Sequence, residues 1–269
     1  MTSRTFRDAF LNYTGRSAGE IMSTIWESLL DLIFPPPLEC PFCKVPTDSA
    51  NTCHECTAIL SAYQDEERCR LCGRFLEDAL PAGKAGTPIC ADCSGSGRPF
   101  TRAMAPAPYD GIIKETIHRF KYNGERHLAA PLAELMVGQL KQQGLAQQGA
   151  DLLLAIPLSY DKLLQRGFNQ AALLAEEISQ ITAIPFEGRI LEKVKDTPAQ
   201  TSLPRVLREI NLYGAFRVTD EKGLSARKVL LIDDVFTTGS TVSAAAGVLK
   251  AAGAAQVYVL TAATARSRR

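Results

Sequence analysis

Residues 228–241 read KVLLIDDVFTTGST, and they contain the clearest structural signal in the chain. The four apolar residues at 229–232 are typical of a parallel strand that is buried on both faces. Asp233 and Asp234 follow directly, and we expect them to end the strand. A hydroxyl-rich turn at 237–241 comes next, and the residues after it have the small, apolar composition of a helix. The stretch therefore predicts a strand, an acidic pair, a turn and a helix.

These parts suit a phosphorylated sugar. A turn that opens a helix presents unpaired backbone N–H groups and the positive end of the helix dipole, so it can hold a phosphate without a lysine. Two carboxylates at the carboxyl end of a strand can accept hydrogen bonds from vicinal hydroxyls or bind a divalent metal. A 5-phosphoribosyl group has both features. A Walker loop and a dinucleotide fingerprint are disfavoured, because the stretch contains neither GxxxxGK[ST] nor GxGxxG.

The stretch resembles the phosphoribosyl pyrophosphate (PRPP) loop of type I phosphoribosyltransferases, which has four apolar, two acidic and two apolar residues before a Thr/Gly-rich turn. The resemblance implies that the acidic pair binds the ribose hydroxyls and that the turn binds the 5-phosphate. The alternative is an ordinary buried strand that ends in a solvated pair of aspartates. The predicted PRPP-binding residues are Asp233, Asp234, Val235, Phe236, Thr237, Thr238, Gly239, Ser240 and Thr241.

Length and composition bound the class of protein. With 269 residues, the chain exceeds an average domain and can bury a substantial core. Hydrophobic residues make up 46% and charged residues 22%, as in ordinary soluble globular proteins. The formal net charge of +1 gives no basic field over the whole protein, so composition does not indicate direct nucleic-acid binding.

The N-terminal region indicates neither export nor membrane insertion. No apolar run approaches the roughly 18 residues of a membrane span, and no signal-peptide core with a cleavage site is present. We therefore expect a cytoplasmic protein without a membrane partner. Apolar residues recur at helical spacing over 20–34, which predicts an amphipathic helix that packs on the body of the protein. Residues 1–34 are assigned to an N-terminal extension that contains this helix.

The eight cysteines all lie in Cys-x-x-Cys pairs between residues 40 and 93. This spacing lets two thiolates face one tetrahedral ion, and Zn²⁺ takes four such ligands, so the cysteines predict two structural zinc sites. A disulfide framework is the alternative, but it belongs to oxidising compartments. Sequential pairing is the simplest, although an interleaved pairing would use the same residues, and His54 is expected at the surface. The predicted metal ligands are Cys40, Cys43, Cys53, Cys56, Cys69, Cys72, Cys90 and Cys93.

The boundary of the ribbons is expected at the linker-like SGSGRP of residues 94–99. We therefore assign 35–98 to a double zinc ribbon and 99–269 to a phosphoribosyltransferase domain. The ribbon region carries more carboxylates than cations, which argues against nucleic acid as its contact. The alternative contact for the ribbons is a protein partner.

The first half of the enzyme domain is expected to contain two amphipathic helices, over 112–121 and 128–142, with Lys121 at the turn between them. A strand around 188–194 is expected farther along the chain. It leads into a long polar insertion at 195–216, which is typical of a lid that closes over a phosphate site.

A second polar cluster is expected at the same edge of the sheet as the first. Residues 152–156 form an apolar strand, and a helix is predicted to start at Asn169. Arg166 and Gly167 lie between them and Gln170 follows, so a second anion site of the same geometry is predicted. The alternative is a helix N-terminus with one chance arginine.

The last predicted strand spans 256–261. The alternation of strands with helices along the chain predicts an α/β fold with a doubly wound parallel sheet. Residues from about 32 to 262 resemble the ComF family of competence-associated phosphoribosyltransferases, which carry an N-terminal double zinc ribbon. The resemblance implies a type I phosphoribosyltransferase fold and Mg²⁺-PRPP as the ligand. It is carried by FPPPLECPFC, HRFKYNGERHLAAPLAELM, IPLSYDKLLQRGFNQAALLA, KDTPAQTSLPRVLREINLYGAF and LLIDDVFTTGST, in that order.

The resemblance also implies roles outside the PRPP loop. The turn at 157–162 would lie near pyrophosphate, and residues of the polar insertion would form a flexible loop. The catalytic candidates are cations that would stabilise the departing pyrophosphate, namely Lys121, Arg166 and Arg208. The residues assigned to pyrophosphate and the flexible loop are Pro157, Leu158, Ser159, Arg166, Gly167, Asn169, Gln170, Thr197 and Gln200.

The acceptor of the phosphoribosyl group is not indicated. Hypoxanthine-type transferases place an Asp where Thr237 stands, which disfavours a 6-oxopurine. Glutamine-dependent PRPP amidotransferases need an N-terminal catalytic cysteine, whereas the first cysteine here is Cys40 in a metal knuckle. We therefore predict a phosphoribosyltransferase with PRPP and an unidentified acceptor. The alternative is a non-catalytic PRPP-sensing or interaction module linked to DNA uptake.

Overall fold

The computed structural model describes residues 38–48, 51–77, 88–95, 97–144, 149–194 and 214–267. These residues fall into two compact units. The smaller takes in 38–40, 45–48 and 51 of the described residues, and the larger takes in all the others. Two predictions lie outside the described residues, namely the amphipathic helix at 20–34 and most of the insertion at 195–216.

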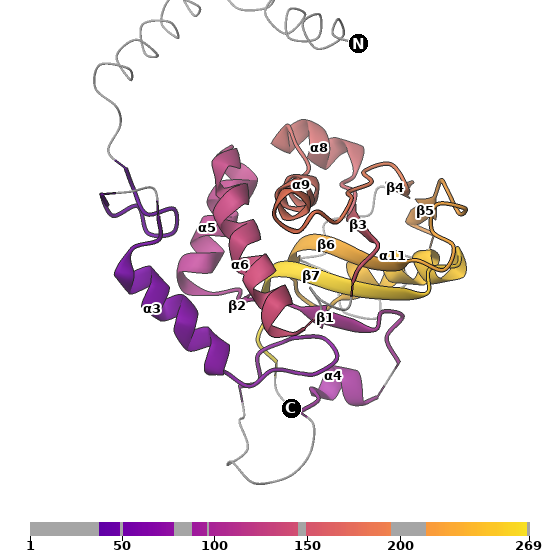
Figure 1. The fold of residues 1–269 in the computed structure, drawn as a ribbon, viewed down its shortest axis with the longest axis horizontal. Coiled ribbons are helices and arrows are strands. Elements are labelled where there is room, and N and C mark those ends of the chain that lie inside the picture. Colours follow the sequence, from indigo (N-terminus) through magenta and orange to yellow (C-terminus); the bar gives the residue numbers. More distant parts are fainter. Residues whose placement is uncertain are drawn as a thin grey trace, which may run out of the picture. The chain divides into compact units, whose positions relative to one another are not determined.

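The larger unit is built on a parallel β-sheet (Figure 1). Its strands in spatial order are β1 (Arg102–Met104), β7 (Gln256–Thr264), β6 (Lys228–Phe236) and β3 (Leu152–Ala155), and β2 (Ala107–Pro108) also pairs with β7. All of these pairs are parallel, as the alternation of strands and helices predicted. Residues 229–232 of β6 are at most 2% exposed, which confirms the strand buried on both faces.

Strand β6 continues beyond the point where we expected it to end. Asp233 pairs with Thr261, and the register runs on through Val235 to the pair of Phe236 with Thr264. The expectation that the acidic pair ends the strand is therefore wrong. The reason is the neighbouring strand, because β7 extends to Thr264 and offers backbone partners along the whole of β6.

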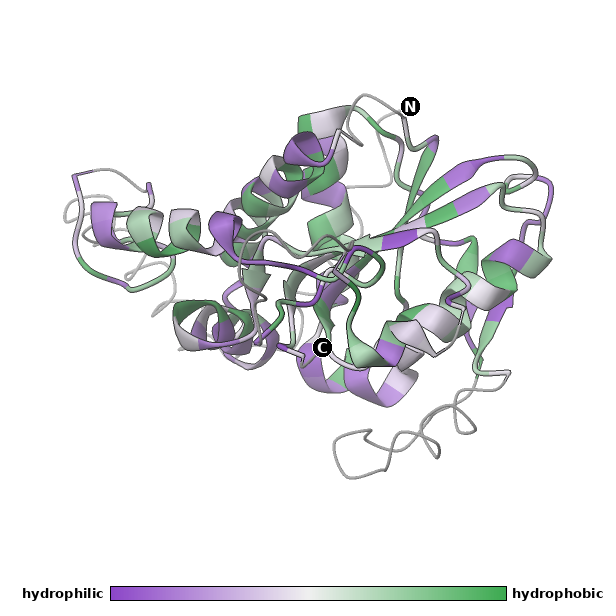
Figure 2. Cartoon of the chain, turned by 90° about the horizontal axis from the view of Figure 1, so that it is seen from below, coloured by the Kyte–Doolittle hydropathy of each residue, from purple (hydrophilic) through white to green (hydrophobic). Residues whose placement is uncertain are grey.

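Four of the described helices have more than ten residues. They are α5 (Gly111–Tyr122), α6 (Ala129–Gln142), α9 (Gln170–Thr182) and α11 (Ser240–Ala251). Helices α6 and α9 pack on each other and on the sheet, while α11 contacts β6 and β7. In α5, the fully buried Ile113, Ile117 and Phe120 recur at helical spacing, so the sequence pattern identified the core face correctly. Figure 2 shows hydrophobic residues (green) and hydrophilic residues (purple) on different faces of the helices.

The strand expected around 188–194 is present, but it lies outside the parallel sheet. It forms β4 (Leu191–Lys193), which pairs antiparallel with β5 (Phe216–Val218) in a separate two-stranded sheet. Beside β3, the chain instead makes a single parallel bridge between Phe186 and Leu153. The main sheet therefore gains no full strand from this segment, because its backbone pairs with β5.

The remaining elements are short. They are the helices α3 (His54–Ala62), α4 (Ala91–Ser94) and α8 (Tyr160–Arg166), and the 3-10 turns η1 (Tyr63–Asp65) and η2 (Arg126–Leu128). Helix α8 begins inside the segment 157–162, which we expected to be a turn. Within the described ranges, no helix is long and apolar enough to cross a membrane.

Candidate phosphoribosyl site

The acidic pair lies at the carboxyl edge of the sheet and faces a lysine from α5. Lys121 Nζ lies 2.8 Å from Asp234 Oδ1, and both side chains are largely buried. The Asp233 carboxylate hydrogen bonds to the backbone, because its Oδ1 accepts from the N–H of Asp234 at 2.9 Å. The fold thus joins Lys121, predicted as a cation near pyrophosphate, to the acidic pair itself.

Burial controls the electrostatics of this cluster. Burial and repulsion by Asp234 raise the pKa of Asp233 to about 7, so this carboxyl titrates near neutral pH. Burial disfavours the charge on Lys121, but attraction by the two carboxylates outweighs it and raises the pKa of the lysine. The cluster therefore combines Lys121, which stays protonated at neutral pH, with Asp233, whose charge can change on ligand binding.

Gly239 shapes the turn that follows β6. Its φ of +78° lies in the left-handed region, and a Cβ there would come within 2.3 Å of Phe236 Cζ. The Phe236 ring is 1% exposed and has little room to move away. Thr238 Oγ1 and Ser240 Oγ lie 2.9 Å apart and hydrogen bond to each other. The turn is therefore packed tightly on its own strand.

Helix α11 starts at this turn with Gly239 as its N-cap residue, which has no side chain, and the Ser240 N–H makes a long hydrogen bond of 3.4 Å to Thr238 Oγ1. A small pocket opens in front of it, and all the predicted PRPP-binding residues except Asp234 and Thr238 line it. The lining residues are Asp233, Val235, Phe236, Thr237, Gly239, Ser240, Thr241 and Val242. Backbone N–H groups at a helix N-terminus beside such a hollow suit an anion.

The polar cluster after β3 is organised differently. Asn169 caps α9, because its Oδ1 accepts from the Ala171 N–H at 3.0 Å, and its Nδ2 donates to the Ile156 carbonyl at 3.0 Å. Gly167 ends α8 with a φ of +74°, and its carbonyl accepts from Arg126 Nη2 at 3.0 Å. Both polar groups of the Asn169 side chain are thus engaged within the fold, and its role at pyrophosphate stays a prediction.

Helix α8 brings two cations toward the acidic pair. Arg166 donates to Gln170 Oε1 at 3.0 Å and interacts electrostatically with Asp233. Lys162 lies one turn earlier, and burial and repulsion by Arg166 lower its pKa. Lys162 was predicted near pyrophosphate only as part of the segment 157–162. Its i, i+4 spacing to Arg166 is the signal that could have identified it as a second cation on the same helix face.

The other predicted residues near pyrophosphate lie just after β3. Pro157 and Leu158 lead from the strand to Ser159, which is the N-cap residue of α8 and is 6% exposed. Its carbonyl accepts from the Leu163 N–H at 2.9 Å. These three residues therefore share the carboxyl edge of the sheet with the acidic pair. The candidates outside the described residues are Thr197, Gln200 and Arg208.

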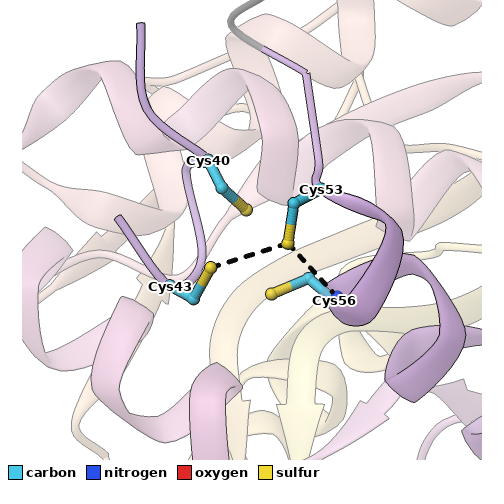
Figure 3. A group of neighbouring side chains, drawn as sticks. All are labelled: Cys40, Cys43, Cys53 and Cys56. Carbon is cyan, nitrogen blue, oxygen red and sulfur yellow. Dashed lines mark hydrogen bonds between the residues drawn. The ribbon is translucent and has the colours of Figure 1, made fainter. Parts of the chain in front are cut away.

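The cysteines form two tetrads, and Figure 3 shows the first with its side chains turned toward a common centre. In each tetrad, the four sulfur atoms lie within 4.8 Å of one another. The pairing left open by the sequence is therefore the sequential one, and the exposed His54 belongs to neither group. The tetrads are Cys40, Cys43, Cys53 and Cys56, and Cys69, Cys72, Cys90 and Cys93.

Donor type and spacing fit zinc. Zn–S bonds of about 2.3 Å in a tetrahedron place the sulfurs about 3.8 Å apart. The Cys43–Cys53 and Cys72–Cys90 sulfur pairs are each 3.6 Å apart. Hydrogen bonds from Cys72 and Cys93 lower the pKa of Cys69, and the hydrogen bonds to Cys69 together with burial raise the pKa values of Cys72 and Cys93. All four cysteines of that tetrad are buried, whereas the first is partly exposed.

Comparisons with known proteins match both parts of the chain. Residues 29–101 match the model of the double zinc ribbon domain, and residues 164–269 match that of the phosphoribosyl transferase domain. The chain is 30% identical to the DNA utilization protein YhgH of Escherichia coli O6:H1 over 224 residues, which cover 82% of this chain and 94% of that protein. It is 27% identical to competence protein F of Haemophilus influenzae over 200 residues, which cover 71% of this chain and 87% of that protein.

A solved structure with detectable similarity is the glutamine phosphoribosylpyrophosphate amidotransferase of B. subtilis in complex with ADP and GMP. The alignment has a TM-score of 0.34 and 20% identity. It covers 53% of this chain and 30% of that chain.

Proposed function

Because this chain belongs to the ComF family, in which a double zinc ribbon precedes a phosphoribosyltransferase domain, we propose that it transfers the 5-phosphoribosyl group of Mg²⁺-PRPP to an acceptor. The observation that carries the proposal is the Lys121–Asp234 ion pair of 2.8 Å, directly before the turn that Gly239 closes. A 5-phosphoribosyl group needs partners for a diol and for a phosphate a few ångströms apart. This edge of the sheet offers both.

In the proposed complex, Asp233 and Asp234 accept hydrogen bonds from the ribose 2- and 3-hydroxyls. The backbone N–H groups and hydroxyls of 237–241 bind the 5-phosphate at the start of α11. The Lys121 ammonium lies 2.8 Å from the Asp234 carboxylate and holds it at the edge of the site. Ionised carboxylates form stronger hydrogen bonds with hydroxyls than neutral acceptors do.

The reaction breaks the bond between ribose C1 and the diphosphate oxygen, and the pyrophosphate leaves with the electron pair. The acceptor then forms the new bond to C1 with its lone pair and releases its proton to the departing pyrophosphate or to solvent. Lys162 and Arg166 of α8 stabilise the negative charge that develops on the leaving group. The rest of the acceleration comes from holding the two reactants in line.

The site also fits Mg²⁺ by its donor chemistry. Mg²⁺ prefers oxygen ligands and is usually bound by one or two carboxylates together with substrate phosphates. Asp233 and Asp234 are the carboxylates available here, and Mg²⁺ would neutralise charge on the diphosphate. The names of the relatives, a DNA utilization protein and a competence protein, suggest a cellular role connected with the uptake or use of DNA.

The test is calorimetric titration of the protein with Mg²⁺-PRPP, followed by a pyrophosphate-release assay with a panel of bases and amines. The double variant Asp233→Asn/Asp234→Asn should bind PRPP about a hundredfold more weakly or worse, because each lost charged acceptor costs about 1.5–3 kcal/mol. Asp151→Asn is the matched control, since Asp151 lies at the opposite end of the sheet and binds the Lys228 N–H.

Release of pyrophosphate with one acceptor would identify the substrate. Tight binding without release for any acceptor would favour the PRPP-sensing alternative. The proposal fails if the wild-type protein does not bind PRPP, or if the double variant binds it as tightly as the wild type.

A further inference from the structure

The second cysteine tetrad lies close to the turn that is proposed to bind the phosphate. The chain around this tetrad contributes two side chains to the surroundings of Phe236. The Phe100 ring meets the Phe236 ring edge-on at 6.1 Å between centroids, and the Arg74 guanidinium lies 5.7 Å from the centre of the same ring. Since a Cβ at residue 239 would collide with Phe236, the turn rests directly on this ring.

The turn around Cys69 and Cys72 in the second tetrad also packs directly against the sheet. Gly73 follows Cys72 with a φ of +70°, and a Cβ there would come within 2.6 Å of the Ala103 carbonyl oxygen in β1. The Ala103 N–H donates to the Leu71 carbonyl at 2.8 Å. The second tetrad is therefore built into the sheet that carries the site.

Arg98 connects the two features directly. Its Nη1 donates to the Thr238 carbonyl in the turn at 3.5 Å, and its guanidinium also lies beside the side chain of Cys93. Its Nε and Nη2 are buried and have no hydrogen-bond partner. Buried donors of this kind normally have an acceptor, because leaving them unpaired costs about 1–3 kcal/mol.

The chemistry of the tetrad supplies that acceptor. A cysteine thiol is only a weak acceptor, whereas the thiolate that binds a metal carries negative charge and accepts much more strongly. Hydrogen bonds from neighbouring residues to metal ligands orient those ligands and tune the site. With zinc bound, the guanidinium of Arg98 has a charged acceptor at Cys93 on one side and the Thr238 carbonyl on the other.

We infer that Arg98 is a positioning residue that couples the second cysteine tetrad to the turn at 237–241, so that zinc binding there sets the turn for the 5-phosphate. This inference rests on the proposed function for its ligand. Coupling between two sites is reciprocal, so a ligand in the turn must also strengthen zinc binding at the tetrad. The ribbon then serves the binding site in addition to stabilising its own fold.

The test compares three variants of the zinc-loaded, full-length protein. Hydrogen exchange of the backbone amides at 237–243 is measured first, because it reports the turn without a ligand. Arg98→Ala should exchange faster there and should bind ribose 5-phosphate about tenfold more weakly. Arg98→Lys keeps one donor group and should recover part of both losses. Arg70→Ala is the matched control, because Arg70 is an exposed arginine of the same ribbon, and it should match the wild type.

Reciprocity gives a readout that a purely structural role would not move. Ribose 5-phosphate should slow one phase of zinc transfer to a chelator in the wild type and should not slow it in Arg98→Ala. The inference is overturned if Arg98→Ala leaves both exchange at the turn and ligand-dependent zinc release unchanged. If the wild type binds neither ribose 5-phosphate nor Mg²⁺-PRPP, the proposed function fails, and the exchange data alone then decide whether the coupling exists.

Discussion

Two helices start near the carboxyl edge of this sheet, and their first turns are capped to different degrees. The N-terminus of α9 is capped by Asn169, which accepts from the Ala171 N–H at 3.0 Å and also donates to the carbonyl of Ile156. The N-terminus of α11 begins at Gly239, which has no side chain, and its Ser240 N–H reaches Thr238 Oγ1 only at 3.4 Å. The sequence alone predicted an anion site of the same geometry at both places. A first turn held by a long hydrogen bond leaves its N–H groups more open to a ligand than one closed by a short cap, so we expect the stronger anion site at α11.

The largest expected effect separates the two glycines at these turns. Gly239→Ala should destabilise the protein by about 2–5 kcal/mol, because a left-handed backbone and a collision with Phe236 add up. Gly167 has a similar φ of +74°, but its nearest neighbour is the Arg126 side chain at 3.5 Å. Gly167→Ala should therefore cost only the backbone term of about 1–2 kcal/mol. Chemical unfolding of both variants checks this, and equal losses would show that the packing against Phe236 does not matter.

The next effect concerns pH, which should act at the β6 turn. Above a pKa of about 7, Asp233 is ionised and can accept from the ribose hydroxyls, so affinity for ribose 5-phosphate should rise as the pH increases through 7. Lys121→Met removes a nearby positive charge, so the pKa of Asp233 should increase and the rise should move to higher pH. Lys114→Met is the control, because Lys114 is exposed on the same helix. The measurement is calorimetric titration with ribose 5-phosphate at several pH values around 7. If the pH dependence of affinity in Lys121→Met matches that of the wild type, the prediction is wrong.

The same pKa has a consequence for stability. The carboxyl of Asp233 titrates at a higher pH in the folded protein than in the unfolded chain, where its pKa is about 3.9. The folded state therefore binds this proton more tightly. Protonation of Asp233 therefore stabilises the folded state fully at a pH below about 3.9, and this stabilisation is lost as the pH rises through 7.

A smaller effect tests the cap of α9. Asn169→Ala should lower the free energy of unfolding by about 1 kcal/mol, because the Ala171 N–H loses its acceptor. Asn169→Asp keeps an oxygen for the cap but loses the donor to the Ile156 carbonyl, which separates the two hydrogen bonds. Urea unfolding measures both variants. If Asn169→Ala is as stable as the wild type, the contrast between the two helix starts is not energetic.

The smallest effect is expected from Lys162, which lies on the β3 side of the proposed site. Lys162→Gln should weaken inhibition by pyrophosphate by about two- to fivefold, which corresponds to the loss of a partly solvated charge interaction of about 0.5–1 kcal/mol. Binding of ribose 5-phosphate, which has no diphosphate, should stay unchanged. If Lys162→Gln weakens the binding of both pyrophosphate and ribose 5-phosphate, Lys162 contacts the 5-phosphate. The two turns would then not bind separate parts of PRPP.

Parts of the site could be predicted because they are written in contiguous residues. The run of apolar residues before Asp233 and Asp234 gives a buried strand wherever it lies, and Cys-x-x-Cys spacing gives a metal knuckle from local geometry alone. The strand β1 was not predicted, because its three residues are too few to show a period, and it exists only through pairing with β7. The end of β6 was misplaced for the same reason.

The sequence by itself determined the fold class, the metal ligands and the order of strand, acidic pair and turn, since each depends on local pattern and spacing. Only the tertiary structure decided which groups meet. It paired Lys121 with Asp234 across more than a hundred residues, placed Phe236 under Gly239, and brought Arg98 between Cys93 and Thr238. Burial and charge at such contacts arise from the packing of distant segments, and no local pattern encodes them.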